Sequence, residues 1–284
     1  MTAPQSASRA ASARPIGVFD SGVGGLTVLR AIRERLPSEA YCYLGDTARL
    51  PYGTKSEHTV ERYALQAADA LVARDIKLLV VACNTASAAA LPAMRARYGG
   101  LPVIGVIEPG ARAACAASAS GRIVVLATEA TVRGGAYQRA ITQLRPDAHV
   151  TAIACGLFVA LAEEGWTEGP IPLQAAERYL SALHAHRESA VDTLVLGCTH
   201  FPALATTIAI AAGPAIRIVD SAATTAVAVA HELMARGLLW EAGQDSGHAA
   251  LRLLATDGPE RFAAVGGRFL AEPLTAGDIE LVDI

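Results

Sequence analysis

The chain has 284 residues, 52% of them hydrophobic and 18% charged, which suffices for one large or two medium folded domains and excludes disorder over most of its length. A net charge of −3 and an isoelectric point near 6.2 give no basic footprint for nucleic acid or an anionic membrane, so neither partner is expected. No apolar run approaches the roughly 18 residues needed to span a bilayer.

The five cysteines are scattered along the chain and form neither a C-x-x-C pair nor a spacing typical of metal ligands. An odd number of cysteines indicates free thiols in a reducing compartment, so we expect a cytoplasmic protein without a metal site. The first 14 residues are rich in Ala and Ser but lack the apolar centre of a signal peptide. We expect them to form a flexible tail.

From Pro15 onward, apolar runs alternate with segments in which apolar residues recur at helical spacing. In the first part of the chain this pattern predicts strands at residues 16–19, 40–45, 78–82 and 101–110, with a loop at 46–54. Helices are predicted at residues 26–36, at 57–74 and after Cys83, where Pro92 should kink or stop the helix.

The same alternation then restarts. It predicts strands at residues 122–127 and 149–154, before Cys198 and at 216–219, helices at 135–144 and 173–186, and a loop that carries Cys155, Glu163 and Glu164. A helical stretch at 224–236, an apolar run at 251–255 and a helix at 259–270 complete the chain. Because this last segment is too small for a third domain, we expect it to pack on the first.

Alternating strands and helices are typical of α/β layers with parallel sheets, and the restart of the pattern indicates two such layers. We therefore predict an α/β fold of two pseudo-symmetric domains whose mostly parallel sheets face each other across a cleft. The first domain would comprise residues 15–108 and 222–284, and the second residues 109–221.

Two cysteines stand in matching contexts. Cys83 follows an apolar run and precedes Asn-Thr in the stretch DIKLLVVACNTASAAAL, and Cys198 takes the same place in DTLVLGCTHFPAL. Ligands of parallel sheets bind beyond the carboxyl ends of the strands, where Asp20 and Thr128 also fall. These positions favour a site with two thiols, of which Cys198 has a basic partner in His200.

The remaining cysteines, Cys42, Cys115 and Cys155, are interpreted as small core residues, the commoner role of a cysteine in apolar sequence. The Asp20 turn, DSGVGG, fails the G-x-G-x-x-G pattern of dinucleotide sites because Thr27 stands at the third glycine. We expect its glycines to let the backbone approach a small anionic ligand, with Ser21 capping the helix that follows.

Lysine is scarce, with only Lys55 and Lys77 in the chain. Lys77 precedes its strand and so lies at the wrong end of the sheet to carry a pyridoxal Schiff base. We therefore expect no pyridoxal phosphate and no other cofactor.

Six stretches, FDSGVGGLTVLR, GDTARLPYG, VVACNTASA, IGVIEPGARAA, TEATVRGGAY and LGCTHFPAL, closely resemble the glutamate racemases, and the resemblance extends from Pro15 to about Leu270. It implies a cofactor-independent enzyme that interconverts L- and D-glutamate and supplies D-glutamate for bacterial peptidoglycan. It also implies two α/β domains with the active site between them, and usually a homodimer.

The resemblance assigns roles by motif. Cys83 and Cys198 would be the acid/base residues on opposite faces of the substrate Cα, with Asp20 assisting Cys83 and His200 assisting Cys198. Glu163 matches an auxiliary glutamate of the family. The residues implied in glutamate binding are Asp20, Ser21, Tyr52, Gly53, Asn84, Thr85, Thr199 and His200.

Three alternatives remain open at this stage. A racemase or decarboxylase of another small acid, such as aspartate or a malonate derivative, would share the chemistry, although a decarboxylase needs only one cysteine. A binding or regulatory protein on this scaffold is the second, since some glutamate racemases also inhibit gyrase. A cysteine hydrolase would use Cys198 and His200 but leave Cys83 idle.

Overall fold

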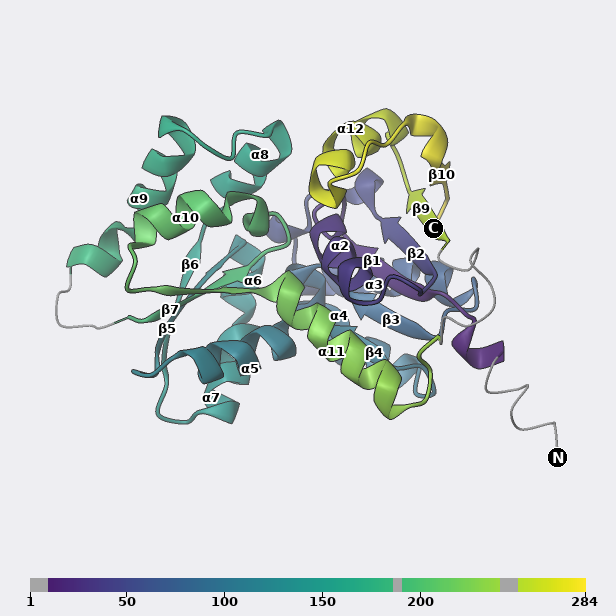
Figure 1. The fold of residues 1–284 in the computed structure, drawn as a ribbon, viewed down its shortest axis with the longest axis horizontal. Coiled ribbons are helices and arrows are strands. Elements are labelled where there is room, and N and C mark those ends of the chain that lie inside the picture. Colours follow the sequence, from purple (N-terminus) through teal and green to yellow (C-terminus); the bar gives the residue numbers. More distant parts are fainter. Residues whose placement is uncertain (1–9, 186–190, 241–249) are drawn as a thin grey trace.

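The computed structural model describes residues 10–185, 191–240 and 250–284 and contains two parallel β-sheets flanked by helices (Figure 1). The first sheet has the strand order β10-β9-β2-β1-β3-β4, and all its pairings are parallel. Its strands are β1 (Ile16–Asp20), β2 (Tyr41–Gly45), β3 (Leu78–Val81), β4 (Val103–Gly105), β9 (Leu251–Ala255) and β10 (Ile279–Leu281).

The second sheet has the order β6-β5-β7-β8 and is also parallel throughout. Its strands are β5 (Arg122–Ala127), β6 (His149–Ala154), β7 (Thr193–Gly197) and β8 (Arg217–Asp220). The order β6-β5-β7-β8 repeats the order β2-β1-β3-β4 of the first sheet, so the internal repeat seen in the sequence is a repeat of topology. The predicted α/β class with two mostly parallel sheets is confirmed.

Helices cover the sheets and connect the strands (Figure 1). They are α2 (Leu26–Arg35), α3 (Glu57–Val72), α4 (Asn84–Arg97), α5 (Ile107–Ala117), α6 (Glu129–Gly134), α7 (Ala136–Leu144), α8 (Leu157–Glu164), α9 (Pro170–Ala185), α10 (Ala205–Ala212), α11 (Ser221–Ala235) and α12 (Pro259–Leu270), with short 3₁₀ turns η1 (Thr47–Arg49), η2 (Tyr52–Thr54), η3 (Phe201–Leu204) and η4 (Ala276–Asp278). Within the described ranges, no helix is both long and apolar enough to cross a membrane.

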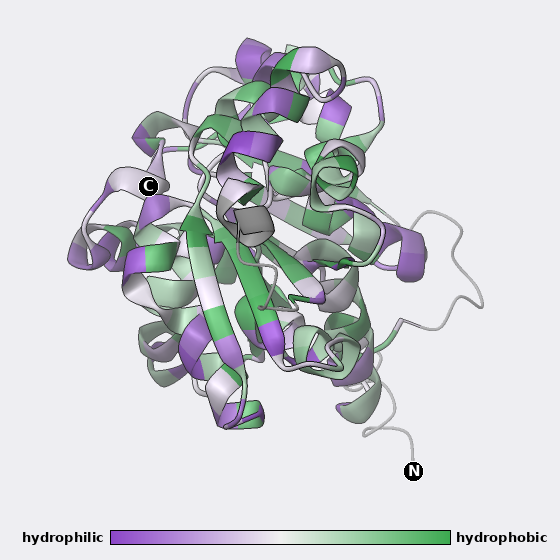
Figure 2. Ribbon diagram, turned by 90° about the vertical axis from the view of Figure 1, so that its left-hand side faces the viewer, coloured by the Kyte–Doolittle hydropathy of each residue, from purple (hydrophilic) through white to green (hydrophobic). Residues whose placement is uncertain are grey.

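The central strands are apolar without interruption because helices bury both of their faces. Every residue of β1, β2, β3 and β7 is buried, and Figure 2 shows the strands mostly in the green of hydrophobic residues. Strand β6, at the edge of its sheet, has a mixed pattern of exposed and half-buried residues. The apolar runs of the sequence therefore located the buried centre of each sheet.

The two halves of the molecule are joined by α5, which leads from β4 to β5, and by α11, which follows β8. Helix α11 packs against both α2 and α5 (Figure 1). The C-terminal segment returns to the first sheet as expected, because β9 pairs with β2 and α12 packs against α2.

Three predictions of local structure are wrong. Pro92 does not stop α4, which continues to Arg97 because burial of neighbouring apolar residues outweighs the one lost backbone hydrogen bond. The strand expected at 101–110 ends at Gly105, since Pro109 lies in the first turn of α5, where a missing N–H costs nothing. The predicted loop with Glu163 contains α8, which ends at Gly165 with a left-handed φ of 77°.

The end of the expected flexible tail also differs from the prediction. Residues 10–12 form a helical turn, and the carbonyl of Ser12 accepts a hydrogen bond of 2.6 Å from Lys77 Nζ. Lys77 is buried in an ion pair with Glu39. It therefore lies at the N-terminal end of β3, opposite the carboxyl ends of the strands. Residues 1–9 of the tail and residue 186 of a predicted helix lie outside the described residues.

Candidate active site

The side chains expected at the carboxyl ends of the strands lie where the topology predicts. Asp20 is the last residue of β1, while Cys83, Thr128 and Cys198 lie just past β3, β5 and β7. Both thiols are nearly inaccessible, with exposed fractions of 5% for Cys83 and 6% for Cys198, and charge on Cys198 raises the pKa of Cys83. Each half of the repeat therefore delivers one buried thiol to a shared region.

Cys83 caps the N-terminus of α4. Its Sγ accepts a hydrogen bond of 3.4 Å from the Ala86 N–H and lies 3.4 Å from Ser21 Oγ. Burial and the carboxyl group of Asp20 raise the pKa of Cys83 to about 12, more than these two hydrogen bonds lower it. At neutral pH the ligand-free protein therefore holds Cys83 as a thiol.

Cys198 has a different partner. Its Sγ lies 3.8 Å from Nδ1 of His200, and the opposite nitrogen of that ring, Nε2, lies 3.0 Å from Oε1 of Glu163. Burial alone would lower the pKa of His200, but hydrogen bonds to Cys198 and Glu163 and the charge of Asp20 raise it to about 10. The ring is therefore protonated at neutral pH, and the two thiols sit in unlike surroundings despite their equivalent positions.

Asp20 is fully buried, and only one of its two carboxylate oxygens has a hydrogen-bond partner among the described residues. Its Oδ2 accepts a hydrogen bond of 3.0 Å from the Gly22 N–H, whereas Oδ1 has no hydrogen-bond partner among the described residues. Burial raises the pKa of Asp20, against the lowering effect of His200 and of nearby backbone N–H groups. A buried acceptor without a partner is costly, so Oδ1 is positioned to receive a donor from a ligand.

Asn84 and Thr85 begin α4 beside Cys83. The Asn84 Oδ1 accepts a hydrogen bond of 2.8 Å from the Tyr137 hydroxyl, which leaves the buried Nδ2 without a partner among the described residues. Thr85 Oγ1 lies 3.0 Å from Thr128 Oγ1 and 3.1 Å from Thr131 Oγ1. An unpaired amide donor, three hydroxyls and a helix N-terminus are together suited to bind a carboxylate.

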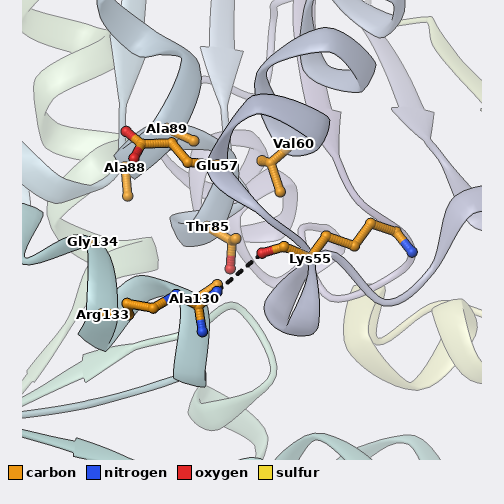
Figure 3. A pocket seen from close by; sticks show the side chains of 9 residues that line it. All are labelled: Lys55, Glu57, Val60, Thr85, Ala88, Ala89, Ala130, Arg133 and Gly134. Carbon is orange, nitrogen blue, oxygen red and sulfur yellow. Dashed lines mark hydrogen bonds between the residues drawn. The ribbon is translucent and has the colours of Figure 1, made fainter.

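A cavity of about 190 Å³ lies next to this cluster (Figure 3), and Thr85 is one of its lining residues. The two halves of the molecule meet across it, because Nη2 of Arg133 in α6 donates a hydrogen bond of 3.1 Å to the Lys55 carbonyl (Figure 3). The hydroxyl cluster therefore lies at a boundary between segments from both sheets.

The glycine turn after β1 packs closely against the Cys198 motif. A Cβ at Gly24 would lie 2.5 Å from the His200 ring and from Thr199 Oγ1, so glycine here allows the turn to approach the Cys198 motif. Thr27 Oγ1 strengthens this contact by donating a hydrogen bond of 2.9 Å to the Thr199 carbonyl. Ser21 does not cap α2, whose N-cap is Gly25 without a side-chain hydrogen bond.

Tyr52 and Gly53, expected at the substrate site, lie in the turn η2. Tyr52 is buried in the same apolar cluster as Cys83, and its hydroxyl donates to the carboxylate of Asp46. A Cβ at Gly53 would lie 2.9 Å from Thr128 Cβ, so this residue packs closely against the end of β5. The structure thus brings both residues near the site, and the Tyr52 hydroxyl already donates its hydrogen bond to Asp46.

Three residues of the site were missed from sequence: Thr131, Tyr137 and Arg261. Thr131 follows Thr128 by one helical turn within TEATVRGGAY, and that spacing could have indicated it. Tyr137 holds Asn84 from α7, and Arg261 Nη2 donates a hydrogen bond of 2.8 Å to Glu163 Oε2 from α12. Neither of these long-range contacts has a local sequence signal.

Comparison with known proteins agrees with this geometry. The sequence profile of the Asp/Glu/Hydantoin racemase family matches residues 16–229. The chain is 51% identical over 271 residues to a glutamate racemase of Geobacter metallireducens, covering 95% of this chain and 97% of the relative. It is 45% identical to a glutamate racemase of Neisseria meningitidis over the same shares of the two chains.

Solved structures show the same fold. A glutamate racemase isoform of Bacillus anthracis superposes with a TM-score of 0.87 at 34% identity, covering 95% of this chain and 98% of the other. A glutamate racemase of Francisella tularensis, solved in complex with D-glutamate, gives a TM-score of 0.86 at 35% identity, covering 96% and 98%.

A buried pair of thiols at equivalent strand ends, together with these matches, defines the class of protein: the chain belongs to the aspartate/glutamate racemase family of enzymes. Within this family it falls among the glutamate racemases, the name carried by its relatives at 45–51% identity over almost the whole chain.

Proposed function

We propose that the chain interconverts L- and D-glutamate without a cofactor, by proton transfer at Cα between Cys83 and Cys198. The observation that carries the proposal is the pair of buried thiols, one from each half of the repeat, at the carboxyl ends of the equivalent strands β3 and β7. Racemisation removes a proton from one face of Cα and returns one to the other, which two opposed groups of the same kind do symmetrically in both directions.

The unlike surroundings of the thiols support a division of roles in the ligand-free state. Cys83 is held as a thiol and is ready to donate a proton, while the protonated ring of His200 lies 3.8 Å from the sulfur of Cys198, where it would stabilise a negative charge during the reaction. In one direction the Cys198 thiolate takes the Cα proton, and Cys83 protonates the opposite face of the planar carbanion. The thiols exchange protonation states in this step, and the reverse direction restores them.

The unsatisfied polar atoms support a bound pose. The substrate ammonium would donate to Oδ1 of Asp20, and the carboxylates would accept from Nδ2 of Asn84 and from the hydroxyls of Thr85 and Thr199. Pairing Asp20 with an ammonium group would also reduce its effect on the pKa of Cys83. In a buried site these hydrogen bonds strengthen as charge develops on the carboxylate of the carbanion. The D-glutamate bound to the Francisella relative supports glutamate as the substrate.

The wider context is also proposed. D-glutamate made by the enzyme would supply peptidoglycan synthesis, and a homodimer is expected from the family resemblance. All five cysteines are free in the structure, which supports a reducing, cytoplasmic location. We further propose that the two sheets mark two domains, residues 15–108 with 222–284 and residues 109–221, which meet within α5 and at the start of α11.

The test of the substrate uses the purified protein with no added cofactor. L-glutamate and L-aspartate are incubated separately, and the enantiomers are resolved by chiral chromatography over time. Glutamate should approach an equal mixture of enantiomers, while aspartate should remain in the L form. Racemisation of aspartate but not glutamate would refute the substrate assignment.

A further inference from the structure

Helix α12, from the C-terminal segment, contacts both Glu163 of α8 and His200 in the other half of the molecule. Arg261 and Arg268 are two helical turns apart on one face of this helix, and both bind Glu163. Phe269, the residue after Arg268, places its ring edge-on to His200, with 5.4 Å between the ring centroids and 85° between the planes. One helix therefore touches both members of the pair.

Both carboxylate oxygens of Glu163 and its backbone carbonyl have hydrogen-bond partners. Oε1 lies 3.0 Å from His200 Nε2, Oε2 accepts a hydrogen bond of 2.8 Å from Arg261 Nη2, and the Glu163 carbonyl accepts from Arg268. Because each oxygen is held from a different side, the carboxylate cannot rotate without losing one of its partners. The plane of the carboxylate in turn sets the direction in which the His200 ring is held.

We propose that Arg261 is a positioning residue for the racemase site: through Glu163 it fixes the orientation of the His200 ring, and with it the direction of Nδ1 toward Cys198. This inference rests on the function proposed above. Arg261 does not touch the thiols, so its effect is on the geometry of His200 alone.

The exposure of the three side chains separates this arrangement from an ordinary surface ion pair. The Arg261 side chain is 65% exposed, but Glu163 is only 15% and His200 only 7% exposed. Because Arg261 itself lies mostly in solvent and packs little apolar surface, its loss should leave the fold intact. A cavity of about 120 Å³, lined by Arg261, Glu163 and Val265, adjoins the pair. Without the guanidinium, water from this cavity can compete for Oε2 and free the carboxylate to turn.

The experiment compares three variants of the full chain. Arg261→Gln removes the charge and the hydrogen bond, and Arg261→Lys keeps the charge. Arg33→Gln is the matched control, because Arg33 binds Glu272 at 2.8 Å, just beyond the end of α12, but does not touch Glu163. We expect Arg261→Gln to lower kcat about tenfold, the loss typical of one hydrogen bond to a charged group, with KM changed less than about twofold. Arg261→Lys should restore most of kcat, and Arg33→Gln should match the unaltered enzyme.

A second readout reports on the ring directly. The ¹⁵N NMR signal of His200 Nε2 should shift and broaden in Arg261→Gln and remain unchanged in Arg33→Gln. If kcat and the Nε2 signal of Arg261→Gln equal those of the unaltered enzyme, or if Arg33→Gln shows the same losses, the inference is wrong. Absence of racemisation in the unaltered enzyme would instead refute the proposed function, and the NMR comparison would still decide whether Arg261 positions His200.

Discussion

Replacing Asp20 with Asn should make the ligand-free protein more stable and far less active. Asp20 is fully buried, its Oδ1 has no partner among the described residues, and burial raises its pKa. An Asp with a raised pKa destabilises the folded state once it ionises, so stability falls as the pH rises from the unfolded pKa of 3.8 through the folded value. Asn is never charged and removes this penalty at neutral pH.

The size of the stability gain follows from the charge of the buried carboxylate. Asn leaves an amide atom in the place of Oδ1, so the gain comes from removing the charge, and an unpaired buried charge costs about 1–3 kcal/mol more than a neutral group in the same place. At about 2–4 °C per kcal/mol for a chain of this size class, the Asp20→Asn variant should unfold roughly 2–12 °C higher, measured by calorimetry without substrate. Its catalytic efficiency should fall by about 10²–10⁴, because a buried ammonium group would lose its carboxylate, a loss of about 3–5 kcal/mol.

The third consequence of Asp20→Asn concerns Cys83. Because Asp20 is the second-largest cause of the raised pKa of this thiol, after burial, its removal should lower the pH at which Cys83 reacts with iodoacetamide. The matched control is the same titration in Cys83→Ser, which removes the signal. An Asp20→Asn variant that unfolds at a lower temperature and keeps more than half of the activity would refute the interpretation of Asp20.

Three further predictions follow from the site. Cys83→Ser and Cys198→Ser should each lower the racemisation rate by about 10²–10⁴ in a chiral assay, and full activity in either variant would exclude the two-thiol scheme. Gly24→Ala should lower the unfolding temperature and the activity together, because its Cβ would meet the His200 ring at 2.5 Å and overpacking costs about 1–3 kcal/mol; unchanged calorimetry would contradict this close approach. Since the folded pKa of His200 is raised from 6.5 to about 10, the stability contributed by the protonated ring should be complete below pH 6.5 and lost as the pH rises through about 10. In the folded enzyme the ring keeps its proton up to about pH 10, so a racemisation rate that falls as the pH rises through 6.5 would contradict this assignment.

Much of the fold was predictable because the buried parallel strands are continuous apolar runs. The repeat of such a run before Cys83 and before Cys198 was enough to predict two equivalent thiols at strand ends, and the topology places them there. The sequence pattern was less informative where a glycine can either end a helix or belong to a loop. Gly165 ends α8 in a left-handed conformation, and without weighing that glycine the segment with Glu163 was predicted as a loop.

The remaining differences come from contacts between residues far apart in the chain. The approach of Gly24 to His200 and the hydrogen bond from Arg261 to Glu163, which are 98 residues apart, depend on how the two halves meet. Local spacing contains no information on either contact. The unpaired atoms of Asp20 and Asn84 are likewise visible only once every nearby donor and acceptor has been placed.

The central claim, that two opposed thiols exchange the Cα proton, is tested most directly by the position of deuterium during the first turnovers. L-glutamate is incubated with the enzyme in D₂O, and the Cα deuterium content of the remaining L-glutamate and of the newly formed D-glutamate is measured by mass spectrometry. Two separate thiols predict that the D-glutamate carries deuterium from its first appearance while the remaining L-glutamate keeps protium. D-glutamate that retains the original protium would show that a single group moves the proton and would contradict the account.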